Sequence, residues 1–160
     1  MQMIRIATFP VVAFLSIAGP VVASPVVPKC GALVSSTAMT EIAFFSSPSE
    51  VPVVITGTTT SVNVPPGESR CIRVRFSAIA NCPNACFLRA SENDIELNPA
   101  WVVNPLRFSQ DSTNGGTANS FEWVGRAGAG KHTIRIRMQT GNTIANADIG
   151  PWTMTVDVMQ

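Results

Sequence analysis

The sequence predicts an all-β protein: a two-sheet antiparallel sandwich of jelly-roll or Greek-key topology, stapled by disulfides. Two segments, residues 70–86 and 130–140, alternate apolar with charged or polar side chains. Short runs rich in Val, Ile and Thr lie between turns spaced about 8–12 residues apart, which is typical of sandwiches. The 160-residue chain has 12 prolines and only 13% charged residues. No segment repeats apolar residues at the helical period over more than a turn or two, so strands are expected throughout.

Alternation along the two segments assigns a face to each side chain, because successive residues of a strand point to opposite sides of the sheet. The predicted buried faces carry Ile72, Val74 and Phe76 in the first segment and Ile134, Ile136 and Met138 in the second. The predicted wet faces carry Cys71, Arg73 and Arg75, and Thr133, Arg135 and Arg137. A shift of one residue would drive the arginines into the core, so the pattern also fixes register.

The other strands are predicted from β-branched or aromatic runs that end at turn residues. In chain order they are residues 41–46, 51–56, 58–64, 87–90, 95–97, 121–124 and 152–158. Turns are predicted at residues 64–69, where Pro66 and Gly67 suit a type II turn, and at residues 125–130.

Three stretches give weaker patterns. Pro105 makes residues 101–108 ambiguous, because proline interrupts a central strand. Residues 109–120 are polar and Gly-rich and are predicted to form a surface loop. Residues 142–148 form either a short strand or a loop.

Residues 1–23 are predicted to be a signal peptide, and residues 24–160 a single β-sandwich domain. Arg5 precedes an apolar run over residues 6–17, and residues 21–23 offer small side chains to a signal peptidase. The run is too short for a typical membrane span, although a retained N-terminal anchor is the alternative. The protein is therefore expected to be exported, as a periplasmic or secreted protein, with no membrane span after cleavage.

The charge balance argues against nucleic acid as a partner. The chain carries 11 Lys and Arg against 10 Asp and Glu. There is thus no basic excess to neutralise a phosphate backbone.

Four cysteines follow the predicted signal peptide, and an even number in an exported chain indicates two disulfides. Of the three possible pairings, the spacing favours Cys82 with Cys86, across a short turn, and Cys30 with Cys71, between the N-terminal tail and the sheet. The alternative is a metal site to which His132 would contribute. A second close pair of ligands is missing, so no metal and no cofactor are expected.

Three stretches carry a resemblance to a known group of proteins: residues 71–78 (CIRVRFSA), residues 120–124 (SFEWV), and residues 128–140 (GAGKHTIRIRMQT) with the closing residues 152–156. In these stretches the chain resembles small exported bacterial β-sandwich proteins of uncharacterised function, with FSA and GxHTxRxR strand motifs. Ile79 stands where that group commonly has an acid, and Met154 where it has Leu. The resemblance implies a jelly-roll-like sandwich and carries over no catalytic residue.

Two motifs suggest chemistry and are better explained by structure. Residues 125–132 (GRAGAGKH) nearly match a phosphate-binding loop, but His132 stands where that loop needs Ser or Thr, and a strand follows instead of a helix. Glu92, Asp94 and Glu96 could hold calcium or act as paired glycosidase acids, yet their spacing suits a solvated turn better. His132, the only histidine, has no nucleophile motif near it.

The arginines offer the main candidate for binding. If the two alternating strands are neighbours, Arg73, Arg75, Arg135 and Arg137 share one surface that could bind an anionic glycan, a phosphate or the carboxylates of another surface protein. The favoured alternative is a solvated face neutralised by cross-strand acids such as Asp157 or Glu122. Likewise Trp101, Trp123 and Trp152 could stack on sugars, but core tryptophans are commoner.

The sequence thus favours an exported, non-enzymatic binding or structural module at the cell surface or in the periplasm, with an unknown ligand. The alternatives are a hydrolase built on a jelly roll and a self-assembling surface or adhesin component.

Overall fold

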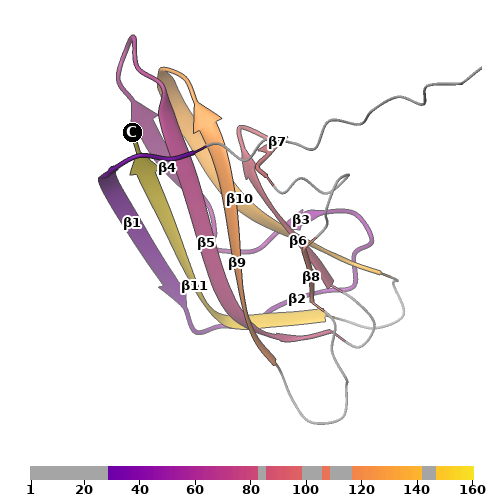
Figure 1. The fold of residues 1–160 in the computed structure, drawn as a ribbon. Helices are drawn as coiled ribbons and strands as arrows, with labels where there is room; N and C mark the ends of the chain where they lie inside the picture. Colours follow the sequence, from indigo (N-terminus) through magenta and orange to yellow (C-terminus); the bar gives the residue numbers. More distant parts are fainter. Residues whose placement is uncertain (1–28, 83–85, 99–105, 109–116, 142–146) are drawn as a thin grey trace, which may run out of the picture.

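In a computed structural model, which describes residues 29–82, 86–98, 106–108, 117–141 and 147–160, the chain forms two antiparallel β-sheets packed as two layers (Figure 1). The five-stranded sheet has the order β1 (Leu33–Glu41), β11 (Ala147–Met159), β5 (Arg70–Asn81) and β9 (Thr117–Ala127), and β2 (Phe45–Ser47) also pairs with β11. The six-stranded sheet has the order β3 (Val53–Val54), β10 (Gly130–Thr140), β6 (Cys86–Glu92) and β7 (Ile95–Glu96); in addition β4 (Thr60–Val64) pairs with β10 and β8 (Leu106–Phe108) with β6. The predicted two-sheet sandwich is confirmed.

The core lies between the sheets and follows the predicted alternation. The predicted inward residues are all fully buried: Ile72, Val74 and Phe76 on β5, and Ile134, Ile136 and Met138 on β10. Trp123 of β9 and Trp152 of β11 join the same cluster. Burying each such side chain contributes about 1.5–3 kcal/mol, so the alternation is the main source of stability.

The two alternating strands, however, are not neighbours. β5 lies between β11 and β9, whereas β10 lies in the other sheet and pairs with β3, β4 and β6. The expectation that they form a pair is therefore wrong. Each of the two strands has one buried and one solvent-facing side, whichever strand lies beside it. The alternation of apolar and polar residues therefore could not predict which strands pair with each other.

Several predicted boundaries shift. β1 was missed, because nearly all of its side chains are exposed and its sequence, LVSSTAMTE, lacks alternation. β9 already begins at Thr117, inside the predicted loop over residues 109–120, and it continues to Ala127, so the predicted turn over residues 125–130 is shorter. The predictions for residues 1–23, 101–105, 109–116 and 142–146 lie outside the described residues.

A break in β11 separates β1 from β2. β1 pairs with β11 up to Glu41 opposite Trp152, and β2 resumes with Phe45 opposite Ile149, with a register shift between those two β11 residues. Gly150 sits at this break with φ +149°, and a Cβ there would lie 2.6 Å from the carbonyl oxygen of Ala43. Only glycine fits such a close approach of two backbones. The predicted continuous strand over residues 41–46 is therefore interrupted.

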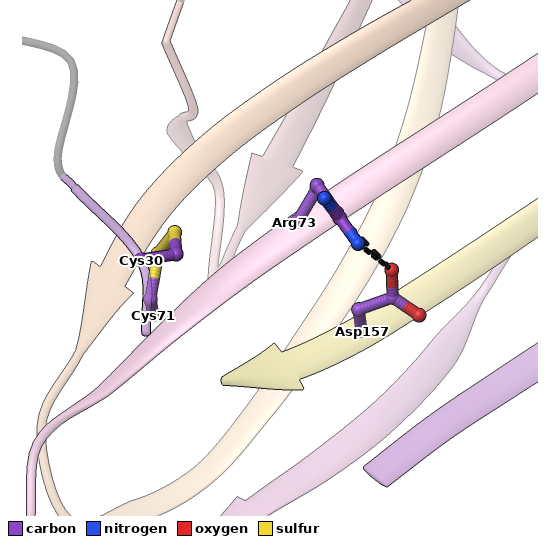
Figure 2. The surroundings of a disulfide bond; sticks show 4 residues. All are labelled: Cys30, Cys71, Arg73 and Asp157. Carbon is purple, nitrogen blue, oxygen red and sulfur yellow. Dashed lines mark hydrogen bonds and ion pairs between the residues drawn. A yellow bond between two sulfur atoms is a disulfide. The ribbon is translucent and has the colours of Figure 1, made fainter. Parts of the chain in front are cut away.

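Both predicted disulfides form. Cys30 and Cys71 join with a Cα–Cα distance of 5.5 Å (Figure 2), and Cys82 and Cys86 with 5.7 Å. The first bond holds the N-terminal tail on the outer side of the five-stranded sheet, where Gly31 N also donates to the carbonyl oxygen of Gln160 at 2.8 Å. Two disulfides suit an oxidising environment. No helix in the described part of the chain is long and apolar enough to cross a membrane.

The two disulfides should differ in their contribution to stability. The Cys30–Cys71 bond closes a sequence separation of 41, and the Cys82–Cys86 bond a separation of 4. The chain-entropy model then predicts losses of about 4 and about 2 kcal/mol when each pair is replaced by serines. Urea denaturation of the two double variants measures both losses. A larger loss for the short loop would contradict the entropic explanation.

Candidate functional site

The four candidate arginines do not share a surface. Arg73 and Arg75 lie on β5 and Arg135 and Arg137 on β10, and the outward faces of these two strands belong to different sheets. The predicted single arginine surface is therefore corrected to two separate pairs on opposite sides of the sandwich. Whether either pair binds a ligand stays a prediction.

The first pair shares one aspartate on the neighbouring strand, which balances one of its two positive charges. Arg73 donates to Asp157 Oδ2 from Nε (3.1 Å) and Nη2 (2.8 Å; Figure 2), and Arg75 Nη2 donates to the same oxygen at 3.0 Å. Ser36 of β1 donates to Oδ1 at 2.7 Å. Asp157 is only 1% exposed. Burial alone would raise its pKa, but the hydrogen bonds from Ser36 and Arg73 and the charges of both arginines outweigh it, so the pKa lies below its ordinary value.

The second pair is bound in the same way by an aspartate in a turn. Asn93 and Asp94 have φ of 46° and 68°, which places them in the tight turn between β6 and β7. Asp94 Oδ1 accepts from Arg135 Nη1 at 2.9 Å and also from Arg137. The hydrogen bond from Arg137 is the largest cause that holds the pKa of Asp94 below its ordinary value. The favoured alternative, arginines balanced by nearby acids, thus describes both pairs.

The three acids near the β6–β7 turn point to separate partners. Asp94 binds the second arginine pair, Glu96 pairs with Arg89, and Glu92 Oε1 lies 2.5 Å from His132 Nδ1. His132 Nε2 lies 2.7 Å from the carbonyl oxygen of Gly128, which can only accept, so this nitrogen carries a proton. Among the residues described, no group of three or more His, Cys, Asp or Glu could hold a metal ion. The GRAGAGKH stretch joins the end of β9 in the five-stranded sheet to the start of β10 in the six-stranded sheet. A turn followed by a strand forms there as predicted, but these two strands do not pair with each other, so the stretch is not a β-hairpin.

The tryptophans form no common platform in the described structure. Trp123 is fully buried and Trp152 is 3% exposed, and both belong to the core. Each has a buried indole N–H without a hydrogen-bond partner in the part of the chain that is described. Trp101 lies outside that part.

Two adjoining hollows at the break in β11 were not predicted. The larger, about 360 Å³, lies on the outer face of the five-stranded sheet and is lined by Ile42, Ile79, Pro151, Thr153 and Asn119, among others. The smaller, about 200 Å³, is lined by Glu41, Ala43, Phe44, Phe45, Ser46, Thr56 and Trp152. Glu41 and Trp152 line both hollows. The one signal in the sequence was the Gly150-Pro151 step inside an otherwise strand-like segment.

The segment between β1 and β2 forms the wall between the hollows. Glu41 Oε1 accepts from the backbone N–H groups of Ile42 (2.9 Å) and Ala43 (3.1 Å), which fixes the bend after β1. Ile42 is 85% exposed and Phe44 is 62% exposed. Two large exposed apolar side chains therefore stand beside the hollows.

The chemistry of the hollows suits binding better than catalysis. Of the described residues that line them, Glu41 is the only titratable one. A glycoside hydrolase normally needs two carboxylates, and covalent catalysis needs a nucleophile beside a base. Hydroxyls, one carboxylate and apolar surface are the usual components of a site that holds a small molecule.

The fold and these surfaces define the chain as a disulfide-stapled antiparallel β-sandwich. No protein-family model and no curated protein matches it. Among solved structures it is similar to a sugar-binding protein described as the EclA C-terminal domain, at 10% identity and a TM-score of 0.43, over 86% of this chain and 87% of that one. It is also similar to Arthrobacter globiformis T6 isomalto-dextranase complexed with panose, at 14% identity and a TM-score of 0.37, over 75% of this chain and 23% of that one. The structure of infectious bursal disease virus, Gx strain, gives 13% identity and a TM-score of 0.36, over 90% of this chain and 42% of that one.

The Asp157 cluster should make the free energy of unfolding depend on pH. Asp157→Asn should lower the free energy of unfolding by about 2 kcal/mol at pH 7, because hydrogen bonds to a charged group are weakened. The folded-state pKa lies below the ordinary value of 3.8. The stabilisation is therefore present above that value and is lost as the pH falls through the folded-state pKa. The difference between wild type and Asp157→Asn should shrink below about pH 4.

Urea denaturation at several pH values measures this difference. Asp94→Asn is the matched control, because Asp94 binds an arginine pair in the same way but is exposed, and its loss at pH 7 should be much smaller. An Asp157→Asn variant that is as stable as wild type at pH 7 would show that the cluster does not stabilise the fold.

Proposed function

We propose that the protein is an exported, non-enzymatic binding module, which holds its ligand at the two hollows beside the break in β11. The main support is that exposed Ile42 and Phe44 stand at hollows whose walls also carry hydroxyls and a carboxylate. The sandwich is the scaffold, and its disulfides keep it folded outside the cell. Most of the wall of the larger hollow is built on β1, β5, β9 and β11, so this hollow is largely formed before the ligand arrives.

The arginine pairs are weaker candidates for the same role. Each pair already donates to one aspartate, so part of its hydrogen-bonding capacity is used within the protein. An anionic ligand would have to compete with that carboxylate. The hollows are therefore the better candidate for the place of binding than the arginines.

Ile79→Ser should weaken ligand binding at the larger hollow by about fivefold to tenfold, because apolar contact is lost. Ile79 is 37% exposed, so the fold should tolerate the change. Ile95→Ser is the matched control: the same substitution at an exposed position on β7 of the other sheet, which should leave binding unchanged. A screen of small glycans and peptides by NMR, followed by titration of the best binder, measures the effect. Equal binding by both variants would move the site away from the larger hollow.

A second function, self-assembly, is supported by the edge of the five-stranded sheet. In the described structure β1 pairs only with β11, so its other side is an open strand edge. Its nine residues, LVSSTAMTE, contain no proline and no charge before Glu41. Protected edge strands usually carry such residues, which block pairing with another molecule. An antiparallel pair of β1 strands would join two copies into one sheet.

The edge-pairing hypothesis predicts a dimer that one charge disrupts. Ala38 is exposed in the middle of β1, so Ala38→Lys should place like charges together at the joined edge and shift the protein to monomer. Sedimentation equilibrium over a range of concentrations measures the shift. A wild-type protein that is monomeric at all concentrations would exclude assembly through β1.

A further inference from the structure

Building on the proposed binding function, we infer that the smaller hollow takes one residue of a neutral saccharide. Three side chains specify this ligand class: an indole N–H that lacks an acceptor, a carboxylate, and an exposed phenyl ring. Each recognises a different part of a sugar, and the hollow brings all three together.

Trp152 supplies an unused hydrogen-bond donor. It lines the hollow and is 3% exposed, and its Nε1–H is buried without a partner among the described residues, so the wall of the hollow must open slightly before a ligand can reach this donor. A buried donor without an acceptor costs about 1–3 kcal/mol. An indole N–H can only donate, so the group that relieves this cost must be an acceptor. A sugar hydroxyl or ring oxygen is such an acceptor.

The ring of Trp152 packs between the connection from β3 to β4 and Phe76 of the neighbouring strand β5. A Cβ added to Gly57, between β3 and β4, would lie 3.1 Å from Cζ2 of Trp152, and Phe76 packs against the ring on the core side with centroids 5.9 Å apart. The ring is therefore held in place before any ligand binds, which lowers the entropic cost of binding.

Glu41 supplies acceptors and sets the charge of the ligand. One carboxylate oxygen already accepts two backbone N–H groups, whose partners are Ile42 and Ala43. The carboxylate can accept further hydrogen bonds, and sugar hydroxyls are suitable donors. Among the described residues that line the hollow, Glu41 is also the only titratable one. Its negative charge disfavours uronates and other anionic sugars, so the structure favours a neutral sugar over the anionic glycan expected from the arginines.

Phe44 supplies a flat apolar surface, and Ser46 and Thr56 add hydroxyls to the wall. The ring is 62% exposed and lies in the bend between β1 and β2, directly before Phe45, which pairs with Ile149. The face of an aromatic ring is electron-rich, so it attracts the C–H groups on the apolar side of a sugar ring. Because Glu41 and Trp152 also line the larger hollow, a second sugar residue can continue into it.

The experiment follows the indole N–H signals of the protein by two-dimensional NMR. The signals are assigned with Trp→Phe variants. Galactose, glucose, mannose and xylose are titrated separately, with galacturonate as the anionic probe and a blocked uncharged tripeptide as the non-sugar probe. At least one neutral sugar should shift the Trp152 signal in a saturable way, with a dissociation constant of about 1–10 mM. The Trp123 signal is the internal control, because that indole is equally buried and lines neither hollow.

Two variants test the assigned roles without disturbing the core. Phe44→Ala should weaken sugar binding about fivefold to tenfold, whereas Ile95→Ala, an exposed apolar residue on β7, should not change it. Glu41→Gln keeps the acceptor for the two backbone N–H groups and removes the charge. It should therefore raise the affinity for galacturonate relative to galactose. If Phe44→Ala or Glu41→Gln behaves as wild type, the sugar site is not the smaller hollow.

The outcomes separate this inference from the binding function on which it rests. If only the tripeptide shifts residues at the hollows, the saccharide is wrong and the binding function stands. Galacturonate binding that equals galactose binding overturns the neutral-sugar assignment. If no probe shifts the Trp152 signal or the amides of Thr40, Phe44 and Ser46, both proposals fail.

Discussion

The alternation of apolar and polar side chains along the central strands β5 and β10 is the constraint on which the structure depends. It buries Ile72, Val74 and Phe76 from one sheet against Ile134, Ile136 and Met138 from the other. The side chains between these buried residues, the arginines among them, point outward because of the same alternation. A change of one residue in either register would place arginines between the sheets, where unpaired charges are too costly to remain.

On the outward faces of the two sheets, each of the two arginine pairs is bound by one aspartate, but the two aspartates differ in burial. Arginines two residues apart on a strand lie on the same face, and each pair needs a counter-charge. Asp157 provides it from the adjacent strand and is buried beneath its partners, whereas Asp94 provides it from a turn and remains exposed. The buried cluster contributes to stability, and the exposed one is screened by solvent and contributes less. Neither leaves a uniform positive surface.

Much of the fold could be predicted from local patterns. The alternation of apolar and polar residues predicted which side chains are buried. The number and spacing of the cysteines predicted both disulfides, including Cys30 with Cys71 across 41 residues. Strand partners could not be predicted, because a strand with one wet face looks the same in either sheet. For that reason the four arginines were placed on one surface. β1 was missed because an exposed edge strand needs no alternation. The hollows were missed because they depend on how closely the backbone at Ala43 approaches Gly150, a contact between segments more than 100 residues apart.

The proposed site depends on this break in pairing, where β11 pairs with β1 on one side of the break and with β2 on the other, and residues 42–44 between them lie outside both strands. A crystal structure of the protein grown with a high concentration of the best-binding neutral sugar tests it most directly. We predict a sugar in the smaller hollow, with an oxygen about 2.9 Å from Nε1 of Trp152 and its apolar side against Phe44. A sugar bound elsewhere on the sandwich, beside an intact and sugar-free hollow, would contradict the account.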